Sequence, residues 1–224
     1  MHSSVRALLY RLKKRITFSK FPGSKAYWEE RYIAGRDSGS GSYNRLAIFK
    51  AEVVNHFVKE NNIKKVIEFG SGDGNQLSLG EYPDYIGLDV SPTIIRLCKE
   101  KFSEDKTKSF FLYDSLCFVD NHNIFKADLT LSLDVVFHLT EDDVFHEYMK
   151  SLFGCSTHYV IVYSSNTDKP QRVHEKDRAF TKWVEQYAPG WKLIKMINNP
   201  YPFDPKDPDN TSKADFYFFE RISL

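Results

Sequence analysis

The sequence predicts an α/β domain built around a seven-stranded, mostly parallel sheet with an N-terminal helical extension. Short apolar runs of strand length alternate with segments of helical periodicity, which is the pattern of repeated β-α-β units. Only the last two runs lack a helix between them, so this pair is expected to be antiparallel. The length of 224 residues suits one domain, and the chain shows no internal repeat and no interdomain linker.

Residues 1–26 are predicted to form a basic N-terminal segment, and residues 27–224 the domain itself. Residues 1–20 hold six basic residues and no acidic one, with apolar residues at near-helical spacing. Such a segment either packs as a solvated helix or makes weak contact with an anionic membrane surface. The rest of the chain carries 25 basic and 30 acidic residues, a balance that does not attract a phosphate backbone, so nucleic acid is not an expected partner.

The helices follow from periodicity and from their capping residues. Apolar positions between Leu46 and Val58 fall on one helical face, and Ser91 followed by Pro92 is typical of a helix start. Residues 140–143 resemble a capping box that opens a helix ending at Gly154. Helices are predicted at residues 27–32, 46–58, 91–102, 140–154 and 175–188.

The strands are short apolar runs bounded by glycine, proline or polar residues. They are predicted at residues 65–69, 85–90, 110–113, 129–133, 159–163, 191–197 and 215–222. Between the first two helices, residues 38–42 read Ser-Gly-Ser-Gly-Ser, a run with little side-chain reason to hold one conformation. No stretch approaches the roughly 18 apolar residues of a membrane-spanning helix.

Three cysteines, Cys98, Cys117 and Cys155, lie far apart in apolar surroundings. None forms a C-x-x-C pair, and the sequence has no H-E-x-x-H pair, so no metal site is expected. We interpret the cysteines as small buried apolar residues. With no recognisable secretory signal, they suit a reducing compartment, and a cytoplasmic location is expected.

The strongest chemical signal is a glycine motif directly after the first predicted strand, Glu68-Phe-Gly70-Ser71-Gly72-Asp-Gly74. Glycines at this turn let a ligand approach the backbone at the carboxyl edge of a parallel sheet. The spacing G-x-G-x-G differs from the G-x-G-x-x-G that holds a pyrophosphate. The negative Glu68 is unsuited to a pyrophosphate and suited to an ammonium group.

Further acidic residues follow the second and third strands. Asp89, with Val90 beside it, is placed to accept hydrogen bonds from both hydroxyls of a ribose. Asp114 and Ser115 are placed to contact an adenine amino group. A nucleoside with a zwitterionic tail and no phosphate satisfies this set, which indicates S-adenosylmethionine as the cofactor.

With these motifs the chain resembles class I S-adenosylmethionine-dependent methyltransferases from about residue 25 to the end. It looks closest to a bacterial subfamily associated with polysaccharide and glycan gene clusters. The stretches that carry this closer likeness are residues 27–32, 38–53, 134–139, 180–183 and 215–221. The resemblance implies a Rossmann-like sheet of order 3-2-1-4-5-7-6 with strand 7 antiparallel, and it places residues 38–42 near the cofactor as a candidate lid. The chain departs from the broad pattern in its short link from Gly74 to Tyr85, which leaves little more than a turn for the first crossover helix.

The residues of the acceptor side are predicted from their positions after the fourth and fifth strands. Asp134 and His138 follow the fourth strand, and His138 is the leading candidate for a general base. His174, with Arg172 and Arg178, forms a second candidate group. Tyr201 and Phe203, in the proline-rich loop before the last strand, are candidates for stacking on an acceptor.

The predicted function is O-methylation of a hydroxyl on a sugar, glycan or glycan precursor, and this choice of acceptor rests on the subfamily resemblance. Another small-molecule acceptor, such as an amine or a phosphorylated metabolite, remains open. A nicotinamide-binding oxidoreductase is a further alternative, which the glycine spacing disfavours. A binding module without activity is disfavoured because the cofactor motif is complete.

Overall fold

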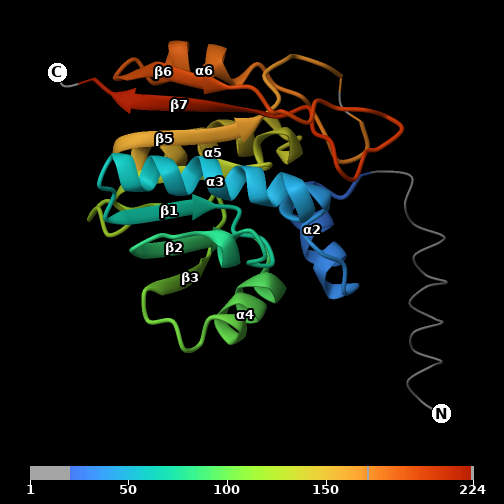
Figure 1. Cartoon of the computed structure of the whole chain (residues 1–224), viewed down its shortest axis with the longest axis horizontal. Helices are drawn as coiled ribbons and strands as arrows, with labels where there is room; N and C mark the ends of the chain where they lie inside the picture. Colours follow the sequence, from blue (N-terminus) through green and yellow to red (C-terminus); the bar gives the residue numbers. More distant parts are fainter. Residues whose placement is uncertain (1–20, 171, 223–224) are drawn as a thin grey trace.

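Seven strands form one sheet of order β3-β2-β1-β4-β5-β7-β6 in the computed structural model, which describes residues 21–170 and 172–222 (Figure 1). The strands are β1 (Lys65–Phe69), β2 (Asp84–Asp89), β3 (Lys108–Leu112), β4 (Ala127–Leu133), β5 (Ser156–Ser164), β6 (Trp191–Ile197) and β7 (Asp215–Arg221). Strands β1 to β5 pair in parallel, and β7 runs antiparallel to both of its neighbours. The predicted fold class and strand order are therefore confirmed.

In the described part of the chain five helices surround this sheet, and they are α2 (Ser24–Ile33), α3 (Asn44–Glu60), α4 (Pro92–Lys101), α5 (Asp142–Gly154) and α6 (Phe180–Tyr187). Between residues 21 and 222, leaving out residue 171, there are also three short 3-10 turns, η1 (Ser40–Ser42), η2 (Leu77–Leu79) and η3 (Val136–His138). The turn η2 stands where a longer crossover helix is usual, as the short link before β2 predicts. The interpretation of residues 1–20 as a helix or membrane contact lies outside the described residues.

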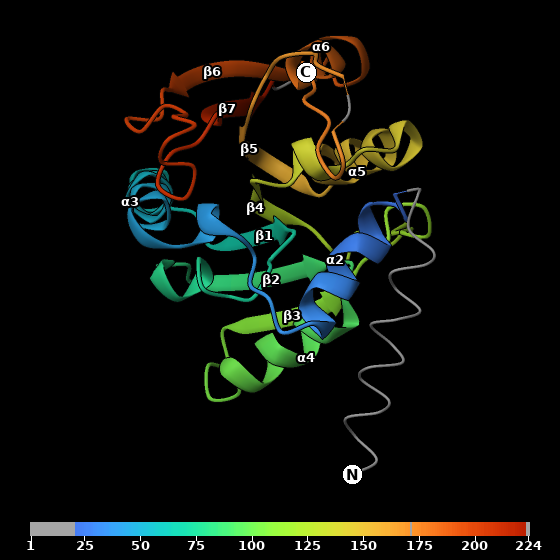
Figure 2. The same ribbon diagram turned by 90° about the vertical axis from the view of Figure 1, so that its right-hand side faces the viewer.

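The core lies on both faces of the sheet. Helix α3 covers one face, and helices α5 and α6 cover the other (Figure 2). Alternate residues of each strand point to opposite faces, so Val66 belongs to the cluster under α3 and Ile67 to the cluster under α5 and α6. Figure 2 looks onto the carboxyl edge of the parallel strands, with α2 lying across it.

Two predictions about local structure are wrong. The last helix was expected to begin at residue 175, but α6 begins at Phe180. The preceding residues are held out of a helix because Arg178 hydrogen-bonds the carbonyl oxygens of Leu139 and Thr140, and Lys176 N donates to Phe137 O. Cys117 is exposed, whereas Cys98 and Cys155 are buried as expected.

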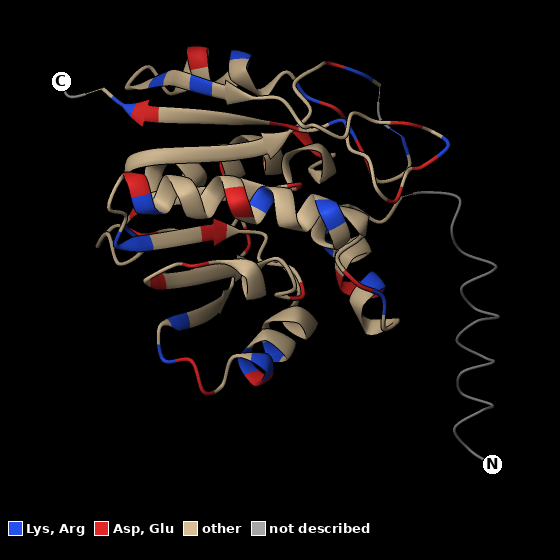
Figure 3. Ribbon diagram, in the orientation of Figure 1, with Lys and Arg blue, Asp and Glu red and all other residues tan. Residues whose placement is uncertain are grey.

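Charged residues of both signs are interspersed over the described helices and loops (Figure 3). Within the described ranges, the structure contains no helix of the length and apolar character that crossing a membrane requires.

Candidate active site

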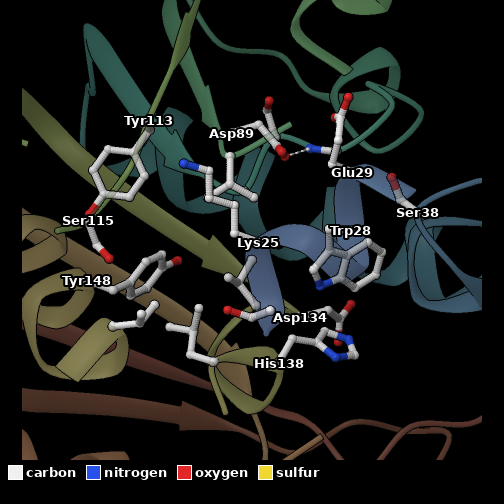
Figure 4. Close-up of a pocket in the computed structure, with 18 of the residues that line it drawn as sticks. Lys25, Trp28, Glu29, Ser38, Asp89, Tyr113, Ser115, Asp134, His138 and Tyr148 are labelled. Carbon is white, nitrogen blue, oxygen red and sulfur yellow. Dashed lines mark hydrogen bonds between the residues drawn. The ribbon is translucent and has the colours of Figure 1, made fainter. Parts of the chain in front are cut away.

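A cavity of about 590 Å³ opens at the carboxyl edge of the sheet, beneath α2. Its wall is formed by the glycine turn after β1, the ends of β2, β3 and β4, helix α2, and the beginning of α5. Figure 4 shows Tyr113 and Ser115 on one side of this cavity, and Trp28, Asp134 and His138 on the other. The cavity therefore collects side chains from segments that lie far apart in the sequence.

The glycine turn requires glycine for two reasons. Gly70 and Gly72 have φ angles of 84° and 56°, in the left-handed region that disfavours side chains. A Cβ atom on Gly70 would collide with Val135, and one on Gly72 would lie 2.5 Å from Ser38 Oγ. Gly74, with φ 70°, faces away from the cavity toward Phe102, so it shapes the turn without lining the site.

The two acidic residues at the ends of β1 and β2 are buried and face the same cavity. Glu68 Oε2 accepts a hydrogen bond of 2.7 Å from the Tyr85 hydroxyl, and burial raises the pKa of Glu68 to about 7. Asp89 accepts hydrogen bonds of 3.0 Å from the backbone N–H groups of Gly72 and Ser91. Burial raises the pKa of Asp89 to about 6 despite these bonds.

The remaining residues predicted to bind the cofactor occupy the side of β3. Ser115 is buried, Val90 is partly buried, and both line the cavity. Asp114 also lines it, but its Oδ2 lies 2.6 Å from Lys25 Nζ, and this hydrogen bond lowers the pKa of Asp114. The Asp114 carboxylate therefore forms an ion pair with Lys25 of α2, in addition to lining the cavity.

Asp134 leaves β4 with a φ of 60°, and its Oδ2 lies 2.6 Å from Lys50 Nζ. Lys50 is only 1% exposed and reaches this wall of the cavity from α3. Sequence reasoning missed it, although its position four residues after Leu46 puts it on the inward, apolar face of the helix. Asp134 is therefore a paired carboxylate.

His138 and His174, predicted as alternatives, lie side by side. Their rings are nearly parallel with centres 5.5 Å apart, and His138 Nδ1 lies 3.2 Å from the backbone oxygen of His174. Burial lowers the pKa of His138 to about 4 and also lowers that of His174. Only His138 lines the cavity.

The arginines of the second candidate group do not face the cavity. Arg178 is committed to backbone carbonyls and to Asp142, 2.6 Å away, and Arg172 bonds through its backbone N–H to Glu175 O. Tyr201 does not line this cavity, and its ring packs against Phe49 and under the Arg45 guanidinium, so its stacking role stays a prediction. Phe203 stays exposed and outside the cavity wall.

Helix α2 forms the roof of the cavity, which the sequence did not reveal. Trp28 packs edge-on against His138, with ring centres 4.9 Å apart, and Tyr27 stacks on His174 at 4.6 Å. Glu29 accepts hydrogen bonds from the hydroxyls of Ser91 and Thr93 at the start of α4. These contacts fix the roof to β4, to the segment before α6, and to α4.

The glycine–serine run is held in place in this structure. Ser38 N donates to Asp73 Oδ2 and Asp73 N donates to Ser38 Oγ, each at 2.8 Å. Ser38 and Ser42 both line the cavity. The run therefore joins the roof to the glycine turn.

Solved structures of known proteins share this fold. An N-methyltransferase, NodS from Bradyrhizobium japonicum in complex with S-adenosylhomocysteine, aligns with a TM-score of 0.66 and 11% identity over 90% of this chain and 100% of its own. The methyltransferase domain of a bacterial Hen1 (CtHen1-C) aligns with a TM-score of 0.59 and 23% identity over 78% of this chain and 97% of its own. Magnesium protoporphyrin IX methyltransferase from Synechocystis, with bound S-adenosylmethionine, aligns with a TM-score of 0.57 and 15% identity over 77% and 78% of the two chains.

No protein-family model and no curated protein sequence matches the chain. The likeness is thus one of fold, and it agrees with the strand order, the antiparallel β7 and the glycine turn described above. The chain has the fold of class I S-adenosylmethionine-dependent methyltransferases.

Proposed function

We propose that this protein is an S-adenosylmethionine-dependent methyltransferase that acts on a hydroxyl of a sugar, glycan or glycan precursor. The observation that carries the proposal is the convergence of Glu68 and Asp89 on one cavity beside a left-handed glycine turn. The acceptor class is the part that rests on the subfamily resemblance.

The cavity suits a nucleoside with a cationic amino-acid tail. Each Asp89 oxygen accepts one backbone hydrogen bond and keeps a lone pair for a ribose hydroxyl. Ser71 Oγ and Gln76 Oε1 line the cavity, are buried, and have no hydrogen-bond partner within the described chain. Buried polar groups are normally satisfied, so these two atoms point to a polar ligand.

The same wall disfavours a dinucleotide. Three acidic side chains, Glu68, Asp89 and Asp134, line this wall. The Lys50 ammonium group also reaches the wall, but it is already paired with Asp134. A pyrophosphate placed at the glycine turn would meet this negative wall without a free cation from it. The geometry therefore supports the sulfonium cofactor over the nicotinamide alternative.

Bound S-adenosylmethionine supplies an activated methyl group, so the protein's main contributions are alignment and exclusion of water. Trp28, Val135 and Leu139 provide apolar surface on the side of the cavity where His138 lies. His138 Nδ1 faces the His174 carbonyl oxygen, which leaves Nε2 with a lone pair. That atom can accept the proton of an acceptor hydroxyl, or bind a Lewis acid that weakens the O–H bond.

The test has two steps. S-adenosylhomocysteine should raise the melting temperature of the protein, and NAD should not. At a concentration one hundred times its Kd, a ligand that binds only the folded state adds about 2.7 kcal/mol to the free energy of unfolding. Labelled S-adenosylmethionine is then incubated with nucleotide sugars, surface glycans and small amines, and mass spectrometry locates the methyl group. Stronger protection by NAD would overturn the cofactor assignment, and exclusive methylation of amines would overturn the acceptor.

A further inference from the structure

Two histidines and a glutamate meet at the end of the cavity under Trp28. His138 comes from η3, and His174 with Glu175 comes from the irregular segment before α6. One donor atom of each residue lies within 4.8 Å of the others, and His174 Nε2 lies 3.9 Å from Glu175 Oε1. The sequence separates the two histidines by 36 positions, so the fold alone creates this group.

The three side chains are of the types that bind a transition-metal ion. His138 and His174 each offer a ring nitrogen, and Glu175 offers a carboxylate oxygen. The group therefore presents two imidazoles and one carboxylate to a single point.

The orientation of His138 also fits a ligand role. Its Nδ1 faces the His174 carbonyl oxygen at 3.2 Å, which assigns the proton to Nδ1 and the lone pair to Nε2. Metal-binding histidines commonly donate their second ring N–H to a backbone carbonyl, which fixes both tautomer and ring orientation. No described residue hydrogen-bonds His138 Nε2, so this lone pair is available.

The spacing of the rings matches a shared ion. Two imidazoles that bind one ion through bonds of about 2.1 Å have ring centres roughly 5 Å apart. The centres of His138 and His174 are 5.5 Å apart, close to this value. Trp28 against His138 and Tyr27 against His174 hold the rings near this arrangement.

Among the residues that the structure describes, Lys213 is the cation that pairs with Glu175. Its Nζ lies 3.0 Å from Glu175 Oε2, whereas Glu175 Oε1 is the oxygen that faces His174. The same Nζ lies 2.6 Å from Asp177 Oδ1. Lys213 therefore keeps a carboxylate partner if Glu175 turns toward a metal ion.

We propose that His138, His174 and Glu175 form a binding site for a divalent transition-metal ion of the Zn²⁺ class at the acceptor end of the cavity. Nitrogen and carboxylate ligands of this kind suit Zn²⁺, and three protein ligands leave further coordination positions open. Because His138 lines the cavity, an open position there faces the space for an acceptor oxygen. This proposal replaces the expectation from sequence that no metal is involved.

The test measures metal binding by the full-length, tag-free protein without cofactor or acceptor. Metal is removed with a chelator, and Co²⁺ and Zn²⁺ are titrated by calorimetry, with the visible absorption of Co²⁺ as a second readout. We expect one equivalent to bind, and we expect His174→Ala and Glu175→Gln each to weaken binding at least tenfold. His158→Ala removes an exposed histidine elsewhere on the surface and should bind like the parent protein.

Each outcome decides the proposal. Absence of stoichiometric binding, or equal binding by the parent protein and His174→Ala, overturns it. A variant that fails to fold is recognised by its melting temperature without metal, in which case the Glu175→Gln result and the Co²⁺ spectrum of the parent decide. Because S-adenosylhomocysteine binding is measured separately, failure of the metal site leaves the proposed function standing, and the reverse also holds.

Discussion

The pKa of Glu68 predicts how cofactor affinity changes with pH. Burial raises this pKa to about 7, and the neighbouring groups that shift it are Tyr85, Lys50 and Asp89. The proposed ligand places an ammonium group beside Glu68 and therefore binds the ionised carboxylate. Below pH 7 the protein must first release the proton, so affinity for S-adenosylhomocysteine should rise with pH and level off above pH 7.

The size of the effect follows from the fraction of ionised Glu68. At pH 6 about one tenth of the carboxyl groups are ionised, and at pH 8 about nine tenths, so Kd should be about tenfold larger at pH 6. Asp89, with a pKa of about 6, adds roughly a further factor of two at pH 6. The expected ratio of Kd between pH 6 and pH 8 is therefore about 10 to 20.

Isothermal calorimetry at a series of pH values measures this ratio. Glu68→Gln keeps an acceptor for the Tyr85 hydroxyl but cannot ionise, so the variant should bind more weakly at pH 8 and show little change down to pH 7. Methylthioadenosine, which lacks the ammonium group, is the matched ligand control and should show only the Asp89 effect. A Kd for S-adenosylhomocysteine that differs by less than twofold between pH 6 and pH 8 would refute the reasoning.

Without ligand, the same shift acts on stability in the opposite direction. The unfolded chain loses the Glu68 proton near the ordinary value of 4.5, whereas the folded protein keeps it to about 7. Between these values the folded state binds more protons, so the free energy of unfolding falls as pH rises and then levels off. Glu68→Gln should remove this part of the pH dependence, which urea unfolding at pH 5 and pH 8 can measure.

The remaining predictions concern three side chains of the cavity. Asp89→Ala should weaken S-adenosylhomocysteine binding about tenfold to a hundredfold by calorimetry, because charge-assisted hydrogen bonds contribute about 1.5–3 kcal/mol, and unchanged affinity in a folded variant would exclude a ribose role. Lys50→Met should lower the free energy of unfolding by about 3–5 kcal/mol, because it leaves the Asp134 carboxylate without its partner. Lys59→Met, at an exposed position of the same helix, should have little effect, and an equal loss of stability in the two variants would contradict a role for the buried pair. His138→Ala should reduce turnover by about 10²–10⁴ while cofactor binding stays normal, and turnover within threefold of the parent would place hydroxyl activation elsewhere.

Local signals in the sequence were sufficient for the strands and for the glycine turn. The continuous apolar runs of β5 and β7 and the glycine spacing after β1 are properties of neighbouring residues, so no tertiary information was needed. The strand order came from the resemblance, because periodicity does not say which strands are neighbours. The error at the start of α6 has a tertiary cause, since Arg178 finds its partners 38 and 39 positions earlier in the chain.

The candidate site also has residues that local sequence signals predict and residues that only the fold reveals. Glu68 and Asp89 could be predicted because each ends a strand, and parallel strands bring their carboxyl ends to one edge. The spacing from Leu46 could place Lys50 on the inward face of α3, but its partner could not be predicted, because only the fold shows that Asp134 lies beside it. The roof formed by α2 was also hidden, since its sequence has too little apolar periodicity to show which face is buried.

The pairing of His138 with His174 changes how the acceptor side is understood. As separate candidates they competed for the role of base, and each had a plausible position after a strand. In the structure the His174 backbone carbonyl orients the His138 ring, and the His174 imidazole lies beside it, so substitution of His174 keeps the backbone contact but removes the second imidazole. Substitution of either histidine should therefore affect turnover, and turnover alone cannot assign the base. Metal titration can separate the roles, because a proton acceptor needs only one free imidazole nitrogen, whereas an ion needs both histidines and Glu175 together.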